Sequence, residues 1–270
     1  MTKLSVKMAG FTDQGKVRSN NEDAVWVDAE MGLFLVADGM GGHQSGEVAS
    51  GMAATTIPTN FKQLTKSGTA GEITNKNFSA ETNRLGFCVK MANQMIFEAS
   101  KRYPQDNGMG TTCTAAFIKD DRLSIAHVGD SRCYLIRRGQ IEQLTQDHSL
   151  VMEQVRQGIL SKDDEAVRLG QNILTRSLGI EPEVKVDVDE HPLFPGDIVI
   201  LCSDGLDKEL KEDKILKTAE ETSDPQALAK RLIDLSNSSG GRDNITVAVA
   251  RIDKASFVES IKRLFRSFGR

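Results

Sequence analysis

The chain has few cysteines and histidines, and their scarcity argues against several kinds of metal or disulfide protein. It contains four of each in 270 residues. The cysteines lie far apart and among apolar neighbours, which is typical of buried, reduced thiols and not of a disulfide framework or a zinc site. No two histidines have the spacing of metal ligands, so a transition metal held through nitrogen is not expected.

Long apolar runs and an excess of positive charge are also absent. The longest apolar stretches, such as residues 198–202, are far shorter than the roughly 18 residues of a membrane-spanning helix. The N-terminal residues lack the apolar region of a secretion signal. The net charge of −4 gives no overall attraction to nucleic acid. We therefore expect a cytoplasmic protein that binds no nucleic acid and forms one main domain.

Short apolar runs recur along the chain and predict β-strands. They occupy residues 24–27, 32–38, 112–118, 122–128, 132–138, 184–188, 197–204 and 244–252. Helices are predicted over 79–102, where apolar residues recur every three or four positions, and from Pro225 onward, with Asp224 as the N-cap. Polar residues predict loops at 65–77 and 158–170. Because several strands follow one another without a helix, antiparallel sheets with helices packed on them are favoured.

Aspartates stand repeatedly at the ends of these apolar runs. Asp38, Asp130 and Asp204 follow predicted strands, whereas Asp23 and Asp243 precede two others. A single aspartate beside glycine is a common turn residue, but carboxylates gathered at strand ends would repel one another unless a cation held them. Because no histidine or cysteine accompanies them, a hard ion such as Mg²⁺ or Mn²⁺ suits them best.

Seven short motifs occur in order along the chain. They are RSNNEDA at 18–24, VADGMGGH at 36–43, GMGTT at 108–112, HVGDSR at 127–132, LTRSLG at 174–179, CSDGL at 202–206 and GRDNITV at 241–247. Their order and approximate spacing resemble the metal-dependent serine/threonine protein phosphatases of the 2C type, especially the compact bacterial members. The resemblance covers about residues 5–252. It implies an α+β fold with four α-β-β-α layers, in which a β-sandwich of two antiparallel sheets is flanked by helices.

The resemblance also implies a binuclear metal site at one end of the sandwich. The residues at the implied ligand positions are Asp23, Asp38, the backbone carbonyl of Gly39, Asp204 and Asp243. Asp38 would bridge the two ions, and Glu22 would act largely through metal-bound water. Asp130 would hold a weaker third metal together with Asp204. Arg18 would bind the substrate phosphate, because its planar guanidinium matches a phosphoryl group better than an ammonium does. Asn244 has a turn-capping role as its simplest interpretation.

The implied chemistry is hydrolysis of phosphoserine or phosphothreonine without a phosphoenzyme. Two ions, Mn²⁺ or Mg²⁺, about 3.5 to 4 Å apart can hold a water between them and lower its pKa enough to supply hydroxide near neutral pH. That metal-bridging hydroxide would attack phosphorus directly. Arg18 would neutralise charge on the phosphoryl oxygens as the seryl or threonyl oxygen leaves.

Two positions depart from the family pattern. Animal members have a histidine, proposed as the general acid, directly after the Asp-Gly pair, where this chain has Met40. His43 and a metal-bound water are the remaining candidates for the proton donor. Many members have an acidic residue four positions after Asp204, where this chain has Lys208, with Asp207 one position earlier. The affinity for a third metal is therefore left open.

The phosphatase domain is predicted over residues 1–253, with a flap at about 148–179 beside the site. Residues 254–270 are predicted to form a basic amphipathic C-terminal helix. Its apolar stripe contains Phe257, Ile261, Leu264 and Phe268. Three alternatives stay open for this helix: docking on the domain, binding in a partner's groove, or contact with a membrane surface.

The sequence as a whole favours an active, monomeric phosphatase that acts on phosphorylated proteins and opposes a Ser/Thr kinase. A binding module on the same fold is the alternative from another functional class. Loss of Asp38, Asp204 or Asp243 would have indicated such a module, and all three are present. Hydrolysis of a small phosphate ester is a third possibility, which the same site chemistry would allow.

Overall fold

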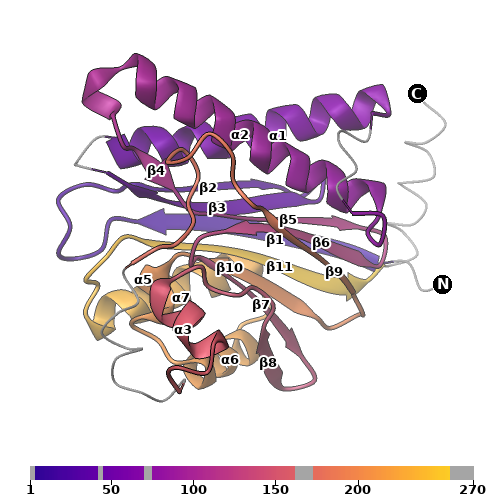
Figure 1. The fold of residues 1–270 in the computed structure, drawn as a ribbon. Helices are drawn as coiled ribbons and strands as arrows, with labels where there is room; N and C mark the ends of the chain where they lie inside the picture. The colour runs from indigo at the N-terminus through magenta and orange to yellow at the C-terminus, as the bar shows by residue number, and fades with distance from the viewer. Residues whose placement is uncertain (1–3, 42–44, 70–74, 162–172, 256–270) are drawn as a thin grey trace.

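The computed structural model of the chain describes residues 4–41, 45–69, 75–161 and 173–255. Two antiparallel β-sheets pack face to face, and helices cover the outer face of each sheet (Figure 1). This arrangement confirms the predicted four-layer sandwich. Among the described residues, no helix has the length and apolar character needed to cross a membrane.

The two sheets are built from strands that are distant in sequence. The first sheet has the order β1 (Leu4–Asp13), β11 (Ile245–Lys254), β10 (Ile198–Cys202), β7 (Arg132–Arg137) and β8 (Gln140–Gln143). The second has the order β2 (Asp23–Asp28), β3 (Leu33–Met40), β5 (Cys113–Lys119), β6 (Arg122–Val128) and β9 (Asp187–Pro192), and β4 (Gly110–Thr111) pairs with the end of β3. All these pairings are antiparallel, as predicted.

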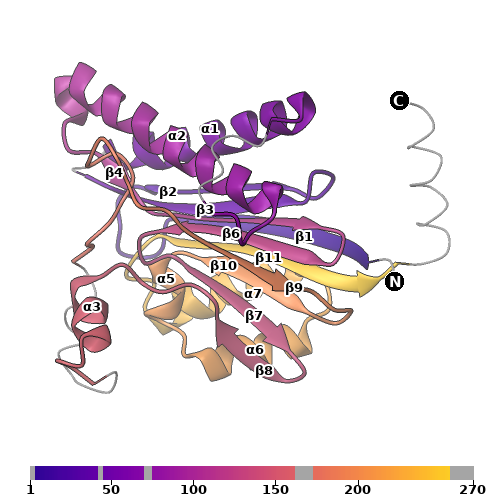
Figure 2. The same cartoon turned by 45° about the vertical axis from the view of Figure 1, so that its right-hand side comes forward.

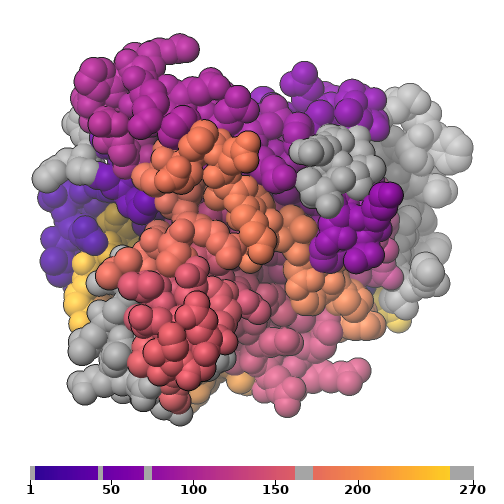
Figure 3. Space-filling view, viewed as in Figure 1, coloured from indigo at the N-terminus to yellow at the C-terminus, as the bar shows by residue number. Residues whose placement is uncertain are grey.

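Helices lie on both outer faces (Figures 1 and 2). The second sheet is covered by α1 (Ser45–Ser67) and α2 (Ala80–Arg102), and the short η1 (Pro104–Asp106) follows α2. The first sheet is covered by α5 (Asp204–Asp207), α6 (Glu212–Glu221) and α7 (Pro225–Ser239). Helix α3 (Leu150–Arg156), in the predicted flap, stands beside the sandwich in Figure 2. In Figure 3, the segment from residue 173 into β9 crosses the surface between α2 and α3.

Strand β3 shows how the layers are held together. Leu33 and Leu35 pack with α1 and α2 in one apolar cluster, whereas Phe34 and Val36 pack between the two sheets in another. Successive side chains of a strand point to opposite faces, so a continuous apolar run suits a strand that is buried on both sides. The same alternation directs Asp38 into the space between the sheets, at the end of the strand.

Several elements differ from the sequence-based prediction. Strand β9 begins at Asp187 and not at 184, and Val184 and Val186 before it pack against the cluster under α1 and α2 without pairing in the sheet. Helix α1 reaches Ser67, into the segment predicted as a loop. The sequence did not predict β1, β8, α1 or α6. The predicted helix of residues 79–102 and the Asp224 N-cap are confirmed, since Asp224 accepts a hydrogen bond from the Ala227 amide.

The C-terminal boundary also needs a correction. Strand β11 continues through Lys254, so a helix cannot begin at that residue. The rest of the predicted amphipathic helix, residues 256–270, lies outside the described residues, and so do His43 and residues 162–172 of the predicted flap.

Candidate active site

The predicted ligands come together at the end of the sandwich where β4 and α5 lie, on the left in Figure 1. Asp23 begins β2 and is the direct cross-strand partner of Asp38 near the end of β3. Asp204 begins α5, with one residue between it and the end of β10, and Asp243 is separated from the start of β11 by Asn244. Asp130 follows β6. Most of these residues line a cleft of about 900 Å³, together with Arg18, Glu22, Gly39 and Lys208. Asp23 is buried.

The pairing of Asp23 with Asp38 is electrostatically unfavourable by itself, because like charges directly opposite on neighbouring strands repel. Burial raises the pKa of Asp23 to about 7, although a hydrogen bond of 2.7 Å from the Ser203 hydroxyl opposes this rise. Burial also raises the pKa of Asp38 well above its usual range, and the charges of Asp23, Asp204, Asp130 and Asp243 raise it further. A bound cation would remove the conflict.

The loop between β1 and β2 carries Arg18 and Glu22 to the cleft. Arg18 donates to the Asp243 carboxylate at 2.8 Å, and its side chain is 54% exposed, so the guanidinium remains open to a ligand. The Glu22 carboxylate accepts a hydrogen bond of 2.9 Å from the Asn20 amide. The Glu22 backbone carbonyl accepts from the Gly39 amide at 3.1 Å. A Cβ atom on residue 39 would lie 2.2 Å from the Gly46 carbonyl oxygen at the start of α1 and 2.5 Å from the Glu22 carbonyl oxygen, so only glycine fits between α1 and this loop.

Asn244 fixes this loop through three hydrogen bonds. Its Oδ1 accepts from the Glu22 amide at 2.8 Å, and its Nδ2 donates to the carbonyls of Gln14 at 2.9 Å and Asn20 at 2.8 Å. Asn244 therefore does more than the turn-capping role expected from the sequence. Asn244 joins the segment before β11 to the loop that holds Arg18 and Glu22.

Two cations already pair with aspartates of the site. Besides the Arg18–Asp243 pair, the Lys208 ammonium forms an ion pair with Asp204. In the described part of the chain, no three histidine, cysteine, aspartate or glutamate side chains form a ready set of metal ligands.

The donor chemistry nevertheless fits a divalent ion. One carboxylate oxygen of Asp23, Oδ1, is buried without a hydrogen-bond partner, and buried polar atoms are rarely left in that state. Among the described residues, its surroundings offer several carboxylates and no histidine or cysteine, which is the donor set that Mg²⁺ and Mn²⁺ prefer.

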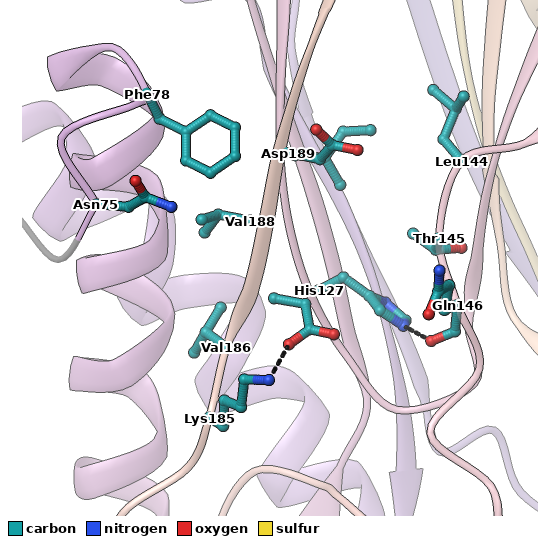
Figure 4. Close-up of a pocket in the computed structure, with 12 residues that line it drawn as sticks. Asn75, Phe78, His127, Leu144, Thr145, Gln146, Lys185, Val186, Val188 and Asp189 are labelled. Atoms are coloured by element: carbon teal, nitrogen blue, oxygen red, sulfur yellow. Dashed lines mark hydrogen bonds and ion pairs between the residues drawn. The ribbon is translucent and has the colours of Figure 1, made fainter. Parts of the chain in front are cut away.

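A second cavity, of about 390 Å³, lies under β6 and β9 and shares no lining residue with the cleft (Figure 4). His127 faces it, and a ring nitrogen of His127 lies 3.1 Å from the Gln146 carbonyl oxygen. The other ring nitrogen bonds the Thr114 hydroxyl at 2.9 Å.

A hydrogen-bonded chain leads from His127 to the aspartates. Thr114 donates to the Ser131 carbonyl at 2.8 Å, and the hydroxyls of Ser131 and Thr112 lie 2.7 Å apart. The Thr112 hydroxyl then accepts from the Asp38 backbone amide at 2.9 Å. This buried polar chain holds the end of β3 in place.

The family model for protein phosphatase 2C matches residues 11–245. The chain belongs to the protein phosphatase 2C family. It is 40% identical over 248 residues to the serine/threonine phosphatase stp of Listeria monocytogenes serotype 4b, across 90% of this chain and 94% of that relative. A solved serine/threonine phosphatase of S. agalactiae superposes with a TM-score of 0.80 at 34% identity, over 91% of this chain and 99% of that one.

A third comparison concerns metal binding. The catalytic domain of the serine/threonine protein phosphatase PstP, solved in complex with two manganese ions, superposes with a TM-score of 0.78 at 34% identity. The superposition covers 93% of this chain and 99% of the PstP chain. This member of the protein phosphatase 2C family is thus a serine/threonine phosphatase, and the family is metal-dependent.

The described histidines do not supply the proton donor that the animal enzymes have. Met40 lines the cleft, and no histidine of the described residues lines it. The four cysteines are free and buried, as expected, and burial raises the pKa of Cys113 to about 12. A thiolate nucleophile is therefore disfavoured.

Proposed function

We propose that this phosphatase hydrolyses phosphoserine and phosphothreonine in proteins at the aspartate-lined cleft, with two Mn²⁺ or Mg²⁺ ions. The observation that carries the proposal is the cross-strand pair of Asp23 and Asp38, which lies near three further aspartates and includes a buried oxygen without a partner. Such a cluster is costly without cations and well suited to them.

The ligands are the five that the sequence suggests. They are Asp23, Asp38, the backbone carbonyl of Gly39, Asp204 and Asp243. Asp38 takes the central position, because its pKa responds to each of the other aspartates and its amide is anchored by Thr112. Bound divalent ions at such a site supply an acidified water and neutralise charge on phosphoryl oxygens.

The chain's own residues bind and orient the substrate. Arg18 reaches the cleft from the β1–β2 loop and has a planar fork of N–H donors that can hold two phosphoryl oxygens. Its present partner Asp243 keeps the guanidinium aligned with the cleft. Glu22, on the same loop, has an acceptor carboxylate in the cleft lining. Since the Met40 side chain carries no transferable proton, Met40 does not protonate the leaving oxygen.

The proposed reaction is tested by phosphate release from a phosphothreonine peptide. Mn²⁺ is expected to support turnover and EDTA to abolish it. Asp38→Asn and Asp204→Asn are each expected to lower kcat/KM by about 1000-fold or more. The matched control is Asp253→Asn, at a 51% exposed side chain on β11 outside the cleft, which should leave turnover unchanged. Metal-independent turnover, or full activity in both site variants, would refute the proposal.

The cellular setting is proposed from the same family membership. Phosphorylated proteins are the substrates, a Ser/Thr kinase opposes the enzyme in signalling, and the protein acts in the cytoplasm as a monomer. Residues 148–179 act as the flap beside the cleft. Ile173 and Leu174, in the cleft lining, support this assignment.

A further inference from the structure

Lys208 lies where a cation can act on two of the site's carboxylates. Helix α5 is a single turn that begins at Asp204, and the Lys208 amide donates to the Asp204 carbonyl at 3.0 Å. This turn places residues 204 and 208 on one side of the helix, so that the ammonium pairs with the Asp204 carboxylate. Lys208, Asp204 and Asp130 all line the same cleft.

The ammonium acts on Asp130 as well. Asp130 lines the same cleft as Lys208, and the positive charge of Lys208 acts on the Asp130 carboxylate. The lysine side chain is only 28% exposed, so solvent screens these interactions less than it would at an open surface.

The acidic neighbour of Lys208 does not take part. The Asp207 carboxylate binds Arg132 at 2.9 Å, and Arg132 also binds Asp147 at 2.7 Å. The Asp207 side chain is 7% exposed and is absent from the cleft lining. Among the described residues, Asp130 and Asp204 are thus the carboxylates left for an ion at this position, and both already interact with the Lys208 ammonium.

We propose that the Lys208 ammonium takes the place of a third metal ion at Asp130 and Asp204, so that this phosphatase works with two ions only. The inference rests on the proposed function for the two-ion centre and departs from it at this one position. A divalent cation entering there would have to displace the ammonium from Asp204 and would be repelled by it. The residues therefore do not fit a third metal.

The proposal is tested by counting bound Mn²⁺ by equilibrium dialysis with the intact protein, in wild type and three variants. Wild type should bind two ions per chain. Lys208→Gln removes the charge, and Lys208→Asp replaces it with a ligand. Both should bind a third ion, and Lys208→Asp at least about tenfold more tightly than Lys208→Gln. Lys214→Gln is the matched control, because Lys214 is exposed on α6 and should leave the count at two.

Two results would overturn the proposal. One is a third ion bound by wild type as tightly as by Lys208→Gln. The other is a count that stays at two in both Lys208 variants, each checked for folding by circular dichroism. Failure of the underlying two-ion function is distinguishable, because wild type would then bind fewer than two ions or release no phosphate from a phosphothreonine peptide with Mn²⁺.

Discussion

Asn244→Ala is expected to weaken both the fold and the catalysis, because this side chain joins the β1–β2 loop to the segment before β11. Asn244 is 6% exposed and makes three hydrogen bonds, to the backbone of Glu22, Gln14 and Asn20. Each such bond contributes about 1 kcal/mol net, and its loss leaves a part-buried backbone group without its partner. We expect the free energy of unfolding to fall by about 3 kcal/mol or more.

The catalytic effect follows from what the loop carries. Arg18 and Glu22 lie on it, and a displacement of about 1 Å in a substrate-positioning residue can cost about 100-fold in rate. We expect kcat/KM to fall by about 10- to 100-fold. Urea unfolding and phosphate release from a phosphothreonine peptide measure the two effects. Asn77→Ala is the control, since Asn77 is exposed and outside the cleft. A loss below about 1 kcal/mol with unchanged kcat/KM would refute the reasoning.

Three further predictions concern single groups. Burial and the neighbouring His148 lower the pKa of His127 to about 4, so the folded state binds fewer protons than the unfolded state below its ordinary pKa of 6.5. The stabilisation from neutral His127 is complete above pH 6.5 and is lost as the pH falls towards 4. By pH 5 this group should lower the free energy of unfolding by about 2 kcal/mol relative to its value above pH 6.5. Urea unfolding should detect this decrease in wild type but not in His127→Gln. Gly205→Ala would place a Cβ atom 2.0 Å from the Asn244 carbonyl oxygen and should lower the free energy of unfolding by about 3 kcal/mol, whereas Gly51→Ala, with open space around it, should raise it by about 0.5 to 1 kcal/mol. Arg18→Lys loses the two-pronged contact with phosphate and should raise KM for a phosphopeptide about tenfold, and an unchanged KM would argue against Arg18 as the phosphate ligand.

The sequence predicted the strands best where burial on both faces leaves a continuous apolar run. The prediction of residues 122–128 matches β6 at both ends, and the predictions of 197–204 and 244–252 match β10 and β11 to within two residues; all three strands lie inside a sheet. Helix α1 was missed because its buried face is made of small residues such as Ala49 and Ala53, which give little contrast with its other face. The layer order came from the resemblance and not from periodicity.

Some of the site residues have a signal in the sequence, and others do not. Aspartates at strand ends have a local signal, and their convergence follows from the sheet order that brings β2, β3, β10 and β11 to one end of the sandwich. The supporting residues have no such signal. Asn244 reaches partners more than 200 positions away, and Thr112 anchors Asp38 from 74 positions away. Both residues lie in the motifs found in the sequence, but only the three-dimensional contacts show which groups they hold.

The most direct test of the account is the position of manganese in crystals of the wild-type phosphatase grown with Mn²⁺. Anomalous scattering should show two ions in the cleft, both bonded to the Asp38 carboxylate, with Asp23, Asp204 and Asp243 completing their protein ligands. Crystals of Asp38→Asn grown in the same way should lose at least one ion. Manganese bound elsewhere, or in the cleft without contact to Asp38, would contradict the assignment of these aspartates as the metal centre.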